Sequence, residues 1–416
     1  MSYLPRIADT ELQERLRSAG AVLIEGPKAC GKTATGQRAS GSMVTLDTDL
    51  AARQLAAIDP GLVLQGPVPR LLDEWQLAPE IWNAMRREVD ARQAVGQFIL
   101  AGSAVPADDL LRHTGAGRLS RLRMRPMCLA ESGWSSGEVS LARLMAGEAV
   151  RAPDTGHSVA WAAEVICRGG WPAARNLSMS ASLRYASDYV EEVCRADVSR
   201  VDGVARNPQR IRRLLQSLAR NSATEVTTTN LARDLGQADE PPSTETVRMD
   251  LQALERIMIL EQQPAWGPHL RSRSRLRQTA KRHLVDPSLA VAALGASPTR
   301  LLGDLNLMGL LFESLVVRDL RILSQPLDGQ VFHYRDNTGL EADAIIELRD
   351  GRWAAFEVKL GVSAIDAAAR SLLDLSARVD HDRCGPPAAL VIITSTGYAY
   401  RRPDGVSVVP IGALGR

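Results

Sequence analysis

Lysine is scarce in this sequence. Of the 50 basic residues only four are lysines, at positions 28, 32, 281 and 359, and arginine fills every other basic position. This composition indicates a coding bias against lysine, so each retained lysine is a candidate for a role that arginine cannot take. Arginine ends in a planar fork, whereas lysine ends in a compact ammonium on a slim stem. The segments that hold the four lysines are therefore of special interest.

Other absences exclude whole classes of protein. The 5 cysteines form no C-x-x-C pair and show no metal-ligand spacing, which favours a reducing compartment. The first residues, MSYLPRIADTELQERL, lack an apolar signal core, and no apolar run approaches bilayer length. We therefore expect a cytoplasmic protein with no membrane partner. The net charge is only +2, so any affinity for nucleic acid must come from local clusters of charge.

Two of the lysines lie in the stretch EGPKACGKTATG, where residues 26–33 match G-x-x-x-x-G-K-[ST]. Residues 21–24 predict a buried strand before this loop, and Thr33 can open a helix after it. In such a loop, backbone N–H groups surround phosphate oxygens, Lys32 reaches the β- and γ-phosphates of ATP, and Thr33 binds Mg²⁺. An accidental Gly-rich turn is the alternative. The predicted ATP-binding residues here are Gly26, Pro27, Lys28, Ala29, Cys30, Gly31, Lys32 and Thr33.

Two carboxylates follow the next apolar segment. In PRLLDEW, Asp73 and Glu74 end a predicted strand, where Asp73 can hold the water shell of Mg²⁺ and Glu74 can orient and deprotonate the attacking water. The alternative is that this pair caps a helix around residues 81–89. A further strand, residues 97–103, ends in Ser103, at the sheet edge where open α/β folds bind ligands. Ser103 is therefore a candidate sensor of the γ-phosphate.

Four arginines occur in the segment HTGAGRLSRLRMRP. Arg121, Arg123 and Arg125 alternate, which is typical of the solvated face of a strand. Arg118 follows a glycine pair, and a flexible loop could present its guanidinium to the nucleotide of a neighbouring subunit as an arginine finger. This role requires an oligomer, so we expect a homo-oligomer.

The stretches GPKACGKT, RLLDEWQ, QFILAGSA and GAGRLSRLRMRPMCL together resemble the AAA-type ATPases of bacteria and archaea. Among these ATPases, the chain is similar to a family whose C-terminal domain, of uncharacterised function, is related to PD-(D/E)XK nucleases. The likeness spans most of the chain. It implies ATP binding and a nuclease-like C-terminal domain, and it implies no particular cellular substrate.

The pattern changes after the ATPase motifs. The breaker-rich stretch MAGEAVRAPDTGHS suggests a linker. From Pro208 onward, three successive stretches predict helices, and strand pairs are expected around residues 259–263 and 282–286. Three helices followed by a strand ribbon are typical of a winged helix, a common DNA-binding shape. The alternative is a module that only packs the flanking domains together.

The stretch HLRSRSRLRQTAKRH carries alternating arginines, and no acidic residue occurs between Glu261 and Asp286. As a strand, it would place four arginines on one face, where they could follow the phosphate backbone of DNA without reading its sequence. A solvated loop is the alternative. The predicted DNA-binding residues are Arg271, Arg273, Arg275, Arg277, Lys281 and Arg282.

The last lysine lies in VFHYRDNTGLEADAIIELRDGRWAAFEVKLG, which predicts three strands separated by turns. A two-residue turn at residues 350–351 would split the apolar residues between both faces. A three-residue loop closed by Gly351 as a bulge instead places Asp343 opposite Glu357. Asp343, Glu357 and Lys359 are then expected together on one face. The residues expected on the opposite, apolar face are Ala342, Ala344, Ile346, Ala354, Phe356 and Val358.

Such a group of charges suits metal-dependent cleavage of phosphodiesters. Asp343 and Glu357 would bind Mg²⁺, which polarises the phosphate and lowers the pKa of a water, and Lys359 would orient that water. The three residues match the D…E-x-K core of the nuclease superfamily. Glu313, on a preceding helix, looks like the carboxylate that often completes that site. The alternatives are a surface salt-bridge cluster and a nuclease-like fold that only binds DNA.

We therefore expect an α/β protein with four parts. These are an N-terminal P-loop (AAA/ASCE-type) parallel-sheet ATPase at 1–146, a linker and helical connector at 147–207, a winged-helix-like domain at 208–298 and a restriction-endonuclease-like α/β domain at 299–416. The predicted function is ATP hydrolysis with Mg²⁺, coupled to a DNA-associated nuclease-like domain in repair or defence. The alternatives are an ATPase that clamps or remodels DNA without cleavage, and a nucleotide-switched interaction protein without a nucleic-acid partner.

Overall fold

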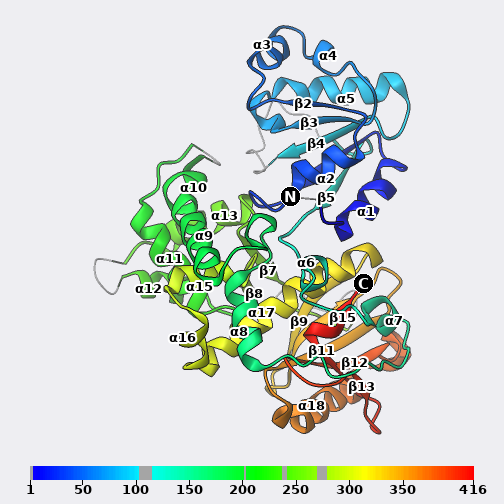
Figure 1. Ribbon diagram of the computed structural model, residues 1–416, viewed down its shortest axis with the longest axis vertical. Coiled ribbons are helices and arrows are strands. Elements are labelled where there is room, and N and C mark those ends of the chain that lie inside the picture. The colour runs from blue at the N-terminus through cyan, green and yellow to red at the C-terminus, as the bar shows by residue number, and fades with distance from the viewer. Residues whose placement is uncertain (1–2, 103–114, 201–202, 237–240, 269–278) are drawn as a thin grey trace. The chain divides into compact units, whose positions relative to one another are not determined.

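The computed structural model describes residues 3–102, 115–200, 203–236, 241–268 and 279–416 (Figure 1). The chain packs into two compact units, each built from three separate segments. Unit 1 comprises Met1–Pro126, Asp197–Ala205 and Ala253–Met258. Unit 2 comprises Met127–Ala196, Arg206–Gln252 and Ile259–Arg416. In the described part of the chain, no helix combines the length and the apolar character needed to cross a bilayer.

Unit 1 contains a five-stranded sheet in which all neighbouring strands are parallel, in the order β2-β3-β4-β1-β5. Strand β4 therefore separates the strand before the phosphate loop from the strand that ends in Asp73. The strands are β1 (Ala21–Glu25), β2 (Ser42–Thr45), β3 (Arg70–Asp73), β4 (Phe98–Gly102) and β5 (Leu119–Arg123). The helices are α1 (Ile7–Leu16), α2 (Lys32–Ala39), α3 (Leu50–Ile58), α4 (Pro60–Val63), η1 (Trp75–Leu77) and α5 (Glu80–Arg92), and α10 (Val198–Arg200) follows later in the chain.

Helices cover both faces of this sheet, which explains why its central strands are apolar throughout. Ala21 and Leu23 of β1 belong to one core cluster, which includes residues of α5. Val22 and Ile24 belong to a second cluster, which includes Leu12 and other residues of α1. Figure 1 shows α5 on one side of the sheet and α1 with α2 on the other. A strand buried on both faces reads as a continuous apolar run, as residues 21–24 do.

Unit 2 begins with a helical part. Its elements are α6 (Leu129–Ser132), β6 (Val139–Ser140), α7 (Leu141–Met145), α8 (Val159–Arg168), η2 (Pro172–Ala174), α9 (Met179–Glu192) and the π-helical turn η3 (Val193–Asp197). Three further helices precede the strand ribbon: α11 (Pro208–Arg220), α12 (Thr228–Leu235) and α13 (Thr244–Arg256), of which α13 belongs to unit 2 only as far as Gln252. Residues 127–146, which the sequence pattern grouped with the ATPase domain, lie in unit 2, where β6 pairs in parallel with the C-terminal β15 (Leu414–Gly415).

The C-terminal part of unit 2 is built on a six-stranded mixed sheet in the order β13-β14-β12-β11-β10-β9. Its strands are β9 (Gln330–Arg335), β10 (Glu341–Glu347), β11 (Trp353–Lys359), β12 (Ala389–Thr394), β13 (Tyr400–Arg401) and β14 (Ser407–Pro410). The helices from residue 287 onward are α15 (Pro287–Leu294), α16 (Pro298–Leu302), α17 (Leu305–Ser324), η4 (Gln325–Leu327), η5 (Val362–Ala364), α18 (Ile365–Arg378), α19 (His381–Cys384) and η6 (Ile411–Ala413). Helices α17 and α18 both pack against β10 and β11.

The predicted ribbon exists as β7 (Leu260–Gln263) and β8 (Lys281–Leu284), which pair antiparallel. The connection between them is tied to the C-terminal sheet. Ala265 forms a parallel bridge with His333 of β9, and Trp266 is buried in the core cluster of that sheet. The start of the connection therefore packs as part of the sheet.

A buried arginine joins three segments within unit 2. Arg318 of α17 donates to Asp286 at 2.8 Å and to Asp319 at 2.7 and 2.9 Å. The two carboxylates in turn accept backbone N–H groups, Asp319 from Leu129 and Asp286 from Gly170, both at 2.9 Å. Each charge is thus paired and hydrogen-bonded, as burial requires. The network anchors residues 129 and 170 to the helix that faces the C-terminal sheet.

Candidate active sites

The phosphate loop connects β1 to α2 in unit 1, as predicted. Gly26 begins the loop at a place with no room for a side chain, because a Cβ atom there would lie 2.4 Å from the carbonyl oxygen of Met124. Gly31 is the N-cap residue of α2, and Lys32 is its first residue. The loop backbone therefore leads directly into a helix N-terminus, where N–H groups and the helix dipole favour an anion.

Lys32 is held inside the loop by backbone carbonyls. Its Nζ donates to the oxygens of Gly26 at 2.9 Å and Pro27 at 2.8 Å, and the residue is only 6% exposed. Carbonyl oxygens carry no full charge, so they orient the ammonium without neutralising it. A phosphate group at the loop would meet a preoriented cation.

Thr33 and Asp73 lie in direct contact although forty positions separate them in the chain. The Thr33 hydroxyl donates to the Asp73 carboxylate, with Oγ1 at 3.0 Å from Oδ1 and 3.1 Å from Oδ2. Burial is the main cause that raises the pKa of Asp73 above its usual range, and the hydrogen bond from Thr33 opposes that shift. A hydroxyl and a carboxylate in contact are oxygen ligands of the kind that Mg²⁺ binds. The donor set at this place therefore fits the predicted ion.

Glu74 directly follows β3 and is the N-cap residue of the short helix η1, although its side chain makes no capping hydrogen bond. Helix α5 begins at Glu80 with Pro79 as its N-cap residue, so the alternative of an Asp73–Glu74 cap is wrong. Glu74 has a left-handed backbone, with φ 50°, and its carboxylate accepts from Nε2 of Gln76. Non-glycine residues held in this conformation often occur at functional sites.

Arg118 lies just before β5 and is paired within its own chain. Its Nε donates to Oδ1 of Asp90, on α5, at 2.6 Å, and both side chains are substantially exposed. Among the alternating arginines, Arg121 pairs with Glu25 and its side chain is 53% exposed, which agrees with a solvated face. Ser103, the predicted γ-phosphate sensor, lies outside the described residues.

Lys28 has a partner that the sequence did not indicate. Its Nζ lies 2.5 Å from Oδ1 of Asp197, the last residue of the π-helical turn η3. The lysine side chain is 47% exposed, and that of the aspartate is 10% exposed. Asp197 belongs to the second segment of unit 1. The phosphate loop is thus tied to a chain segment far away in sequence, and the rarity of lysine was the signal that could have prompted a search for its partner.

The hairpin of β10 and β11 has the predicted register. Ala344 pairs with Phe356 and Glu347 with Trp353, which continues to Asp343 opposite Glu357. Gly351 has φ 89°, the left-handed conformation that the bulge requires. The six residues expected on the apolar face are all buried. The other face differs from the expectation, because Ile345 and Ala355 are also buried, in a cluster with residues of α18.

Five charged side chains of alternating sign meet at this hairpin, and we call them the charged cluster. Lys281 Nζ lies 2.6 Å from Glu313 Oε1 and 3.9 Å from Asp343 Oδ1. Lys359 Nζ lies 2.7 Å from Glu357 Oε2 and 3.5 Å from Asp343 Oδ2. The structure therefore brings the four residues predicted for the nuclease-like site together and adds a fifth, Lys281.

Burial dominates the electrostatics of the cluster. Burial, followed by the nearby charge of Asp343, raises the pKa of Glu313 to about 8 and that of Glu357 to about 7, and the adjacent lysines oppose both shifts. Lys281 is buried and Lys359 is partly exposed, and the carboxylates around them hold the pKa values of both lysines above the usual range despite the opposing effect of burial. The cluster is a compact set of mutually compensating charges, which is buried at Glu313, Glu357 and Lys281 and partly exposed at Asp343 and Lys359.

The placement of Lys281 corrects one prediction. Lys281 is only 7% exposed and its ammonium contacts Glu313, so this lysine is not available to a DNA phosphate. Arg282, also predicted to bind DNA, donates to the carbonyl oxygen of Val226. Lys281 and Arg282 are the first two residues of β8. Arg271, Arg273, Arg275 and Arg277 lie outside the described residues.

The charged cluster does not fit a metal ion in its present arrangement. Its three carboxylates offer the oxygen ligands that Mg²⁺ prefers. However, among the residues that the structure describes, no three His, Cys, Asp or Glu side chains are grouped so as to hold a metal ion. The reason is visible in the contacts, because a lysine ammonium separates each neighbouring pair of carboxylates.

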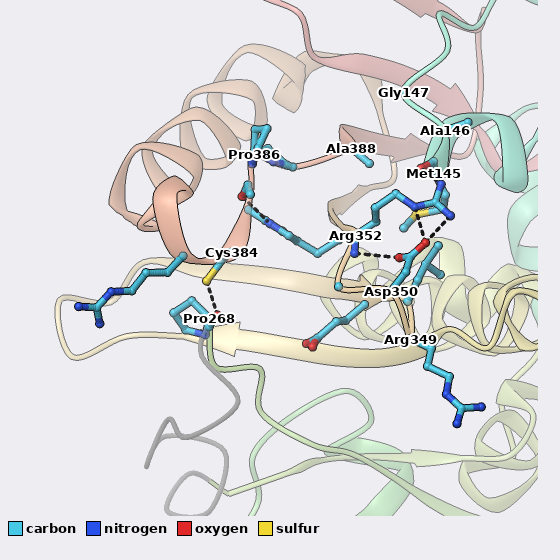
Figure 2. A pocket seen from close by; sticks show the side chains of 17 residues that line it. Met145, Ala146, Gly147, Pro268, Arg349, Asp350, Arg352, Cys384, Pro386 and Ala388 are labelled. Carbon is cyan, nitrogen blue, oxygen red and sulfur yellow. Dashed lines mark hydrogen bonds and ion pairs between the residues drawn. The ribbon is translucent and has the colours of Figure 1, made fainter.

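A hollow of about 1080 Å³ in unit 2 lies at the other end of the β10–β11 hairpin (Figure 2). It is lined by residues 145–147, Pro268, residues 347–353 and residues 383–388. Arg352 is engaged with Asp350 and with the carbonyl oxygen of Met145, and Cys384 contacts the carbonyl oxygen of Pro268. None of the predicted site residues lines this hollow. The polar side chains of Arg352 and Cys384 already contact other residues of the protein, so we do not assign the hollow a function.

Comparison with known protein families identifies one functional domain. Residues 18–132 match the model of an AAA domain, and this range contains all five strands of the parallel sheet of unit 1. Residues 160–300 match a Domain of unknown function (DUF8612), and residues 308–414 match another Domain of unknown function (DUF4143). These two matches cover the helical part and the C-terminal sheet without indicating an activity.

Similar proteins extend over nearly the whole chain. The uncharacterized protein Mb2031c of Mycobacterium bovis and the uncharacterized protein Rv2008c of Mycobacterium tuberculosis are each 27% identical over 97% of this chain and 83% of their own length. Among solved structures, the Walker-type ATPase paby2304 of Pyrococcus abyssi matches 69% of this chain and 94% of its own, with 13% identity and a TM-score of 0.41. The ORC1 protein of Aeropyrum pernix in complex with DNA matches 71% of this chain and 93% of its own, with 15% identity and a TM-score of 0.27.

Proposed function

We propose that this protein hydrolyses ATP at the phosphate loop of unit 1. The observation that carries the proposal is the contact of Thr33 with Asp73, because it joins the phosphate loop to the strand end that also bears Glu74. An AAA domain match over residues 18–132 supports nucleotide binding at this loop.

Each side chain has a distinct task in this proposal. Lys32, already oriented by two carbonyls, binds the β- and γ-phosphates of the nucleotide. Thr33 and Asp73 would hold Mg²⁺, which neutralises charge on the phosphates when it is bound. Glu74 orients the attacking water and accepts its proton. The remaining loop residues, from Gly26 to Gly31, contribute backbone N–H groups to the phosphate oxygens.

Two substitutions test these tasks. Lys32→Ala should abolish binding of ATP, because the ammonium that meets the β- and γ-phosphates is removed. Glu74→Gln should leave ATP binding within about twofold of wild type but slow hydrolysis by roughly a hundredfold or more, since an amide cannot accept the proton. Binding is measured by isothermal titration calorimetry and turnover by phosphate release. Glu80→Gln, the same chemical change at an exposed position six residues later, should behave as wild type. Normal turnover in Glu74→Gln would remove Glu74 from the catalytic role.

We further propose that the ATPase is coupled to a nuclease-like domain that acts on DNA. The supporting observation is the convergence of Glu313, Asp343, Glu357 and Lys359 at one end of the β10–β11 hairpin. The four-part organisation of the chain, including a winged-helix-like region, belongs to this proposal. Contacts of Arg271, Arg273, Arg275 and Arg277 with DNA phosphates, and a homo-oligomer in which Arg118 reaches a neighbour's nucleotide, are also part of it.

A cleavage assay tests the charged cluster directly. Lysine has rotatable donors on a slim stem, whereas arginine keeps the charge but changes its shape. We therefore expect Lys359→Arg to lose DNA cleavage as completely as Lys359→Ala, with ATP hydrolysis unchanged in both. The measurement is nicking of linear and branched DNA with Mg²⁺, with and without ATP. Wild-type nicking by Lys359→Arg would show that Lys359 only balances charge.

The same assay separates the alternatives. An ATPase that clamps or remodels DNA without cleavage would retain DNA in a salt-dependent manner and leave it intact. A nucleotide-switched interaction protein would hydrolyse ATP and retain no DNA at physiological salt.

A further inference from the structure

Lys281 occupies the space between two of the carboxylates in the charged cluster. Its ammonium lies 2.6 Å from Glu313 Oε1 and 3.9 Å from Asp343 Oδ1. The residue is 7% exposed, so water contributes little to solvating this charge. The D…E-x-K pattern contains one lysine, and Lys281 is a second cation that reaches the cluster from another strand.

The remaining carboxylate oxygens of the hairpin are also engaged. Asp343 Oδ2 accepts the backbone N–H of Val358 at 2.8 Å and lies 3.5 Å from Lys359 Nζ. Glu357 Oε2 accepts from the same ammonium at 2.7 Å. A hard divalent cation needs several carboxylate or carbonyl oxygens at roughly 2.0–2.6 Å. The ammonium of Lys281 lies between the carboxylates of Glu313 and Asp343, where such a cation would bind.

The backbone of Lys281 is fixed at this place by Gln263, its partner across the β7–β8 ribbon. Gln263 is fully buried, and its Nε2 donates to the carbonyl oxygens of Phe332 at 2.8 Å and Asp343 at 2.9 Å. The ribbon is thereby pinned to both strands next to the cluster. The position of the lysine is part of the fold, whereas its long side chain retains rotatable bonds that allow the ammonium to withdraw.

We propose that Lys281 is the resident cation of the charged cluster, and that a divalent cation enters between Glu313 and Asp343 only when this ammonium leaves. The inference rests on the proposed nuclease-like function, for which the sequence predicts Asp343 as a metal ligand. Two cations at one place in a poorly solvated site repel strongly, so occupancy by one excludes the other. Lys281 then determines whether the nuclease-like centre can bind its metal ion.

The test compares binding of Mn²⁺ to the nucleotide-free full-length protein and to Lys281→Met, which keeps an apolar stem of similar length and removes the charge. Lys281→Met should bind Mn²⁺ about tenfold more tightly or better at one site, because an opposing charge in contact has been removed. Titration calorimetry and the electron paramagnetic resonance of free Mn²⁺ both measure this. Adding Asp343→Asn to Lys281→Met should abolish the gain, which assigns it to the cluster.

Arg349→Met is the matched control, since it removes one positive charge at an exposed position near the turn of the same hairpin. It should leave Mn²⁺ binding unchanged. An equal gain in both variants would mean that only the net charge matters, and it would overturn the inference. Unchanged Mn²⁺ affinity in Lys281→Met would overturn it as well.

Removal of Lys281 leaves the buried Glu313 without its ammonium partner, which can destabilise the folded protein. A second variant therefore keeps a hydrogen-bond donor at this position. Lys281→Gln keeps a donor for Glu313 without the charge and should show the same gain in Mn²⁺ affinity, together with a higher unfolding temperature in the presence of Mn²⁺. Wild type supplies an independent check. It should bind as many Mn²⁺ ions as Asp343→Asn does, and a tight site present in wild type but lost in Asp343→Asn would contradict a resident lysine.

DNA cleavage, measured in parallel, distinguishes failure of this inference from failure of the proposed function. Tighter Mn²⁺ binding in Lys281→Met with no cleavage by either protein would support the resident cation and reject cleavage as the function. Mg²⁺-dependent cleavage by wild type, with no gain in Mn²⁺ affinity in Lys281→Met, would support cleavage as the function and reject the resident cation.

Discussion

Each of the four lysines donates to oxygen atoms at a candidate site or at its border. Lys28 contacts Asp197 and Lys32 contacts two carbonyls of the phosphate loop. Lys281 and Lys359 contact Glu313 and Glu357 of the charged cluster. In a chain that strongly favours arginine, the compact ammonium was retained at places that admit a single point charge. The rarity of lysine thus pointed to positions that no sequence motif alone linked to a site.

At the scale of single residues, the sequence could predict side chains whose roles depend on neighbours in the chain. Lys32, Thr33 and the pair Asp73–Glu74 follow from local motifs, because a strand and a loop fix each of them. Lys281 could not be assigned correctly, since its partners lie 32 and 62 positions away on other elements. Burial decides its role, and burial follows from tertiary packing that no alternating pattern encodes.

The buried carboxyl of Glu313 gives a prediction for stability against pH. Its pKa is raised from 4.5 to about 8, chiefly by burial and next by Asp343. Between these values the folded protein binds more protons at Glu313 than the unfolded chain does. Its contribution to stability is therefore complete below pH 4.5 and is lost as pH rises through 8. The free energy of unfolding should fall over this window by at most about 1.4 kcal/mol per pH unit from this group.

Glu313→Gln should remove that part of the pH dependence, because the amide does not titrate. The measurement is urea unfolding between pH 4.5 and 8.5 in the presence of a chelator. Glu80→Gln, at an exposed position, should keep the wild-type slope. If Glu313→Gln retained the full wild-type slope, Glu313 would not be the group that titrates in the folded protein.

At the scale of elements, the β10–β11 hairpin was predictable because its turn obeys a local rule. Only one loop length keeps the apolar residues of both strands together, and Gly351 supplies the left-handed residue that this loop requires. The sequence predicted the β7–β8 ribbon as a pair of strands, but it did not predict that the ribbon packs against the C-terminal sheet. Trp266 and Gln263 connect it to the C-terminal sheet, and such contacts between distant segments leave no periodic signal in the sequence.

Gly351→Ala tests the turn. A Cβ at this position would meet no atom within 4 Å, so the cost comes from the φ angle of 89° alone. We expect a loss of about 1–2 kcal/mol in the free energy of unfolding. Gly361→Ala is the control, because that glycine also has open space and its φ is −127°. Chemical denaturation of both variants gives the comparison, and equal stabilities would refute the bulged turn as the cause.

At the scale of the whole molecule, the proposed role of Arg118 depends on the protein forming a homo-oligomer. In the structure it pairs with Asp90 of its own chain, so a role at a neighbour's nucleotide requires that exposed pair to open. Water screens exposed pairs of this kind, so a nucleotide phosphate could compete for the guanidinium.

Mixing two inactive variants tests this role. If Arg118 acts between subunits, equal amounts of Arg118→Ala and Glu74→Gln protein should regain roughly a quarter of wild-type ATP hydrolysis, as random association predicts. Lys32→Ala mixed with Glu74→Gln should regain none, since both changes affect the same site. Absence of recovery at every mixing ratio would argue against shared sites.

Unit 1 is assembled from segments that leave the ribosome at very different times. Its last segment, Ala253–Met258, is synthesised long after Pro126, by roughly ten seconds at elongation rates of about 5–20 residues per second. Asp197, the partner of Lys28, also emerges only after β5 is complete. A nascent chain arrested between residues 126 and 196 would therefore carry every motif of the phosphate loop without the segment that holds Lys28. Nucleotide affinity during translation should consequently rise in steps as the later segments arrive.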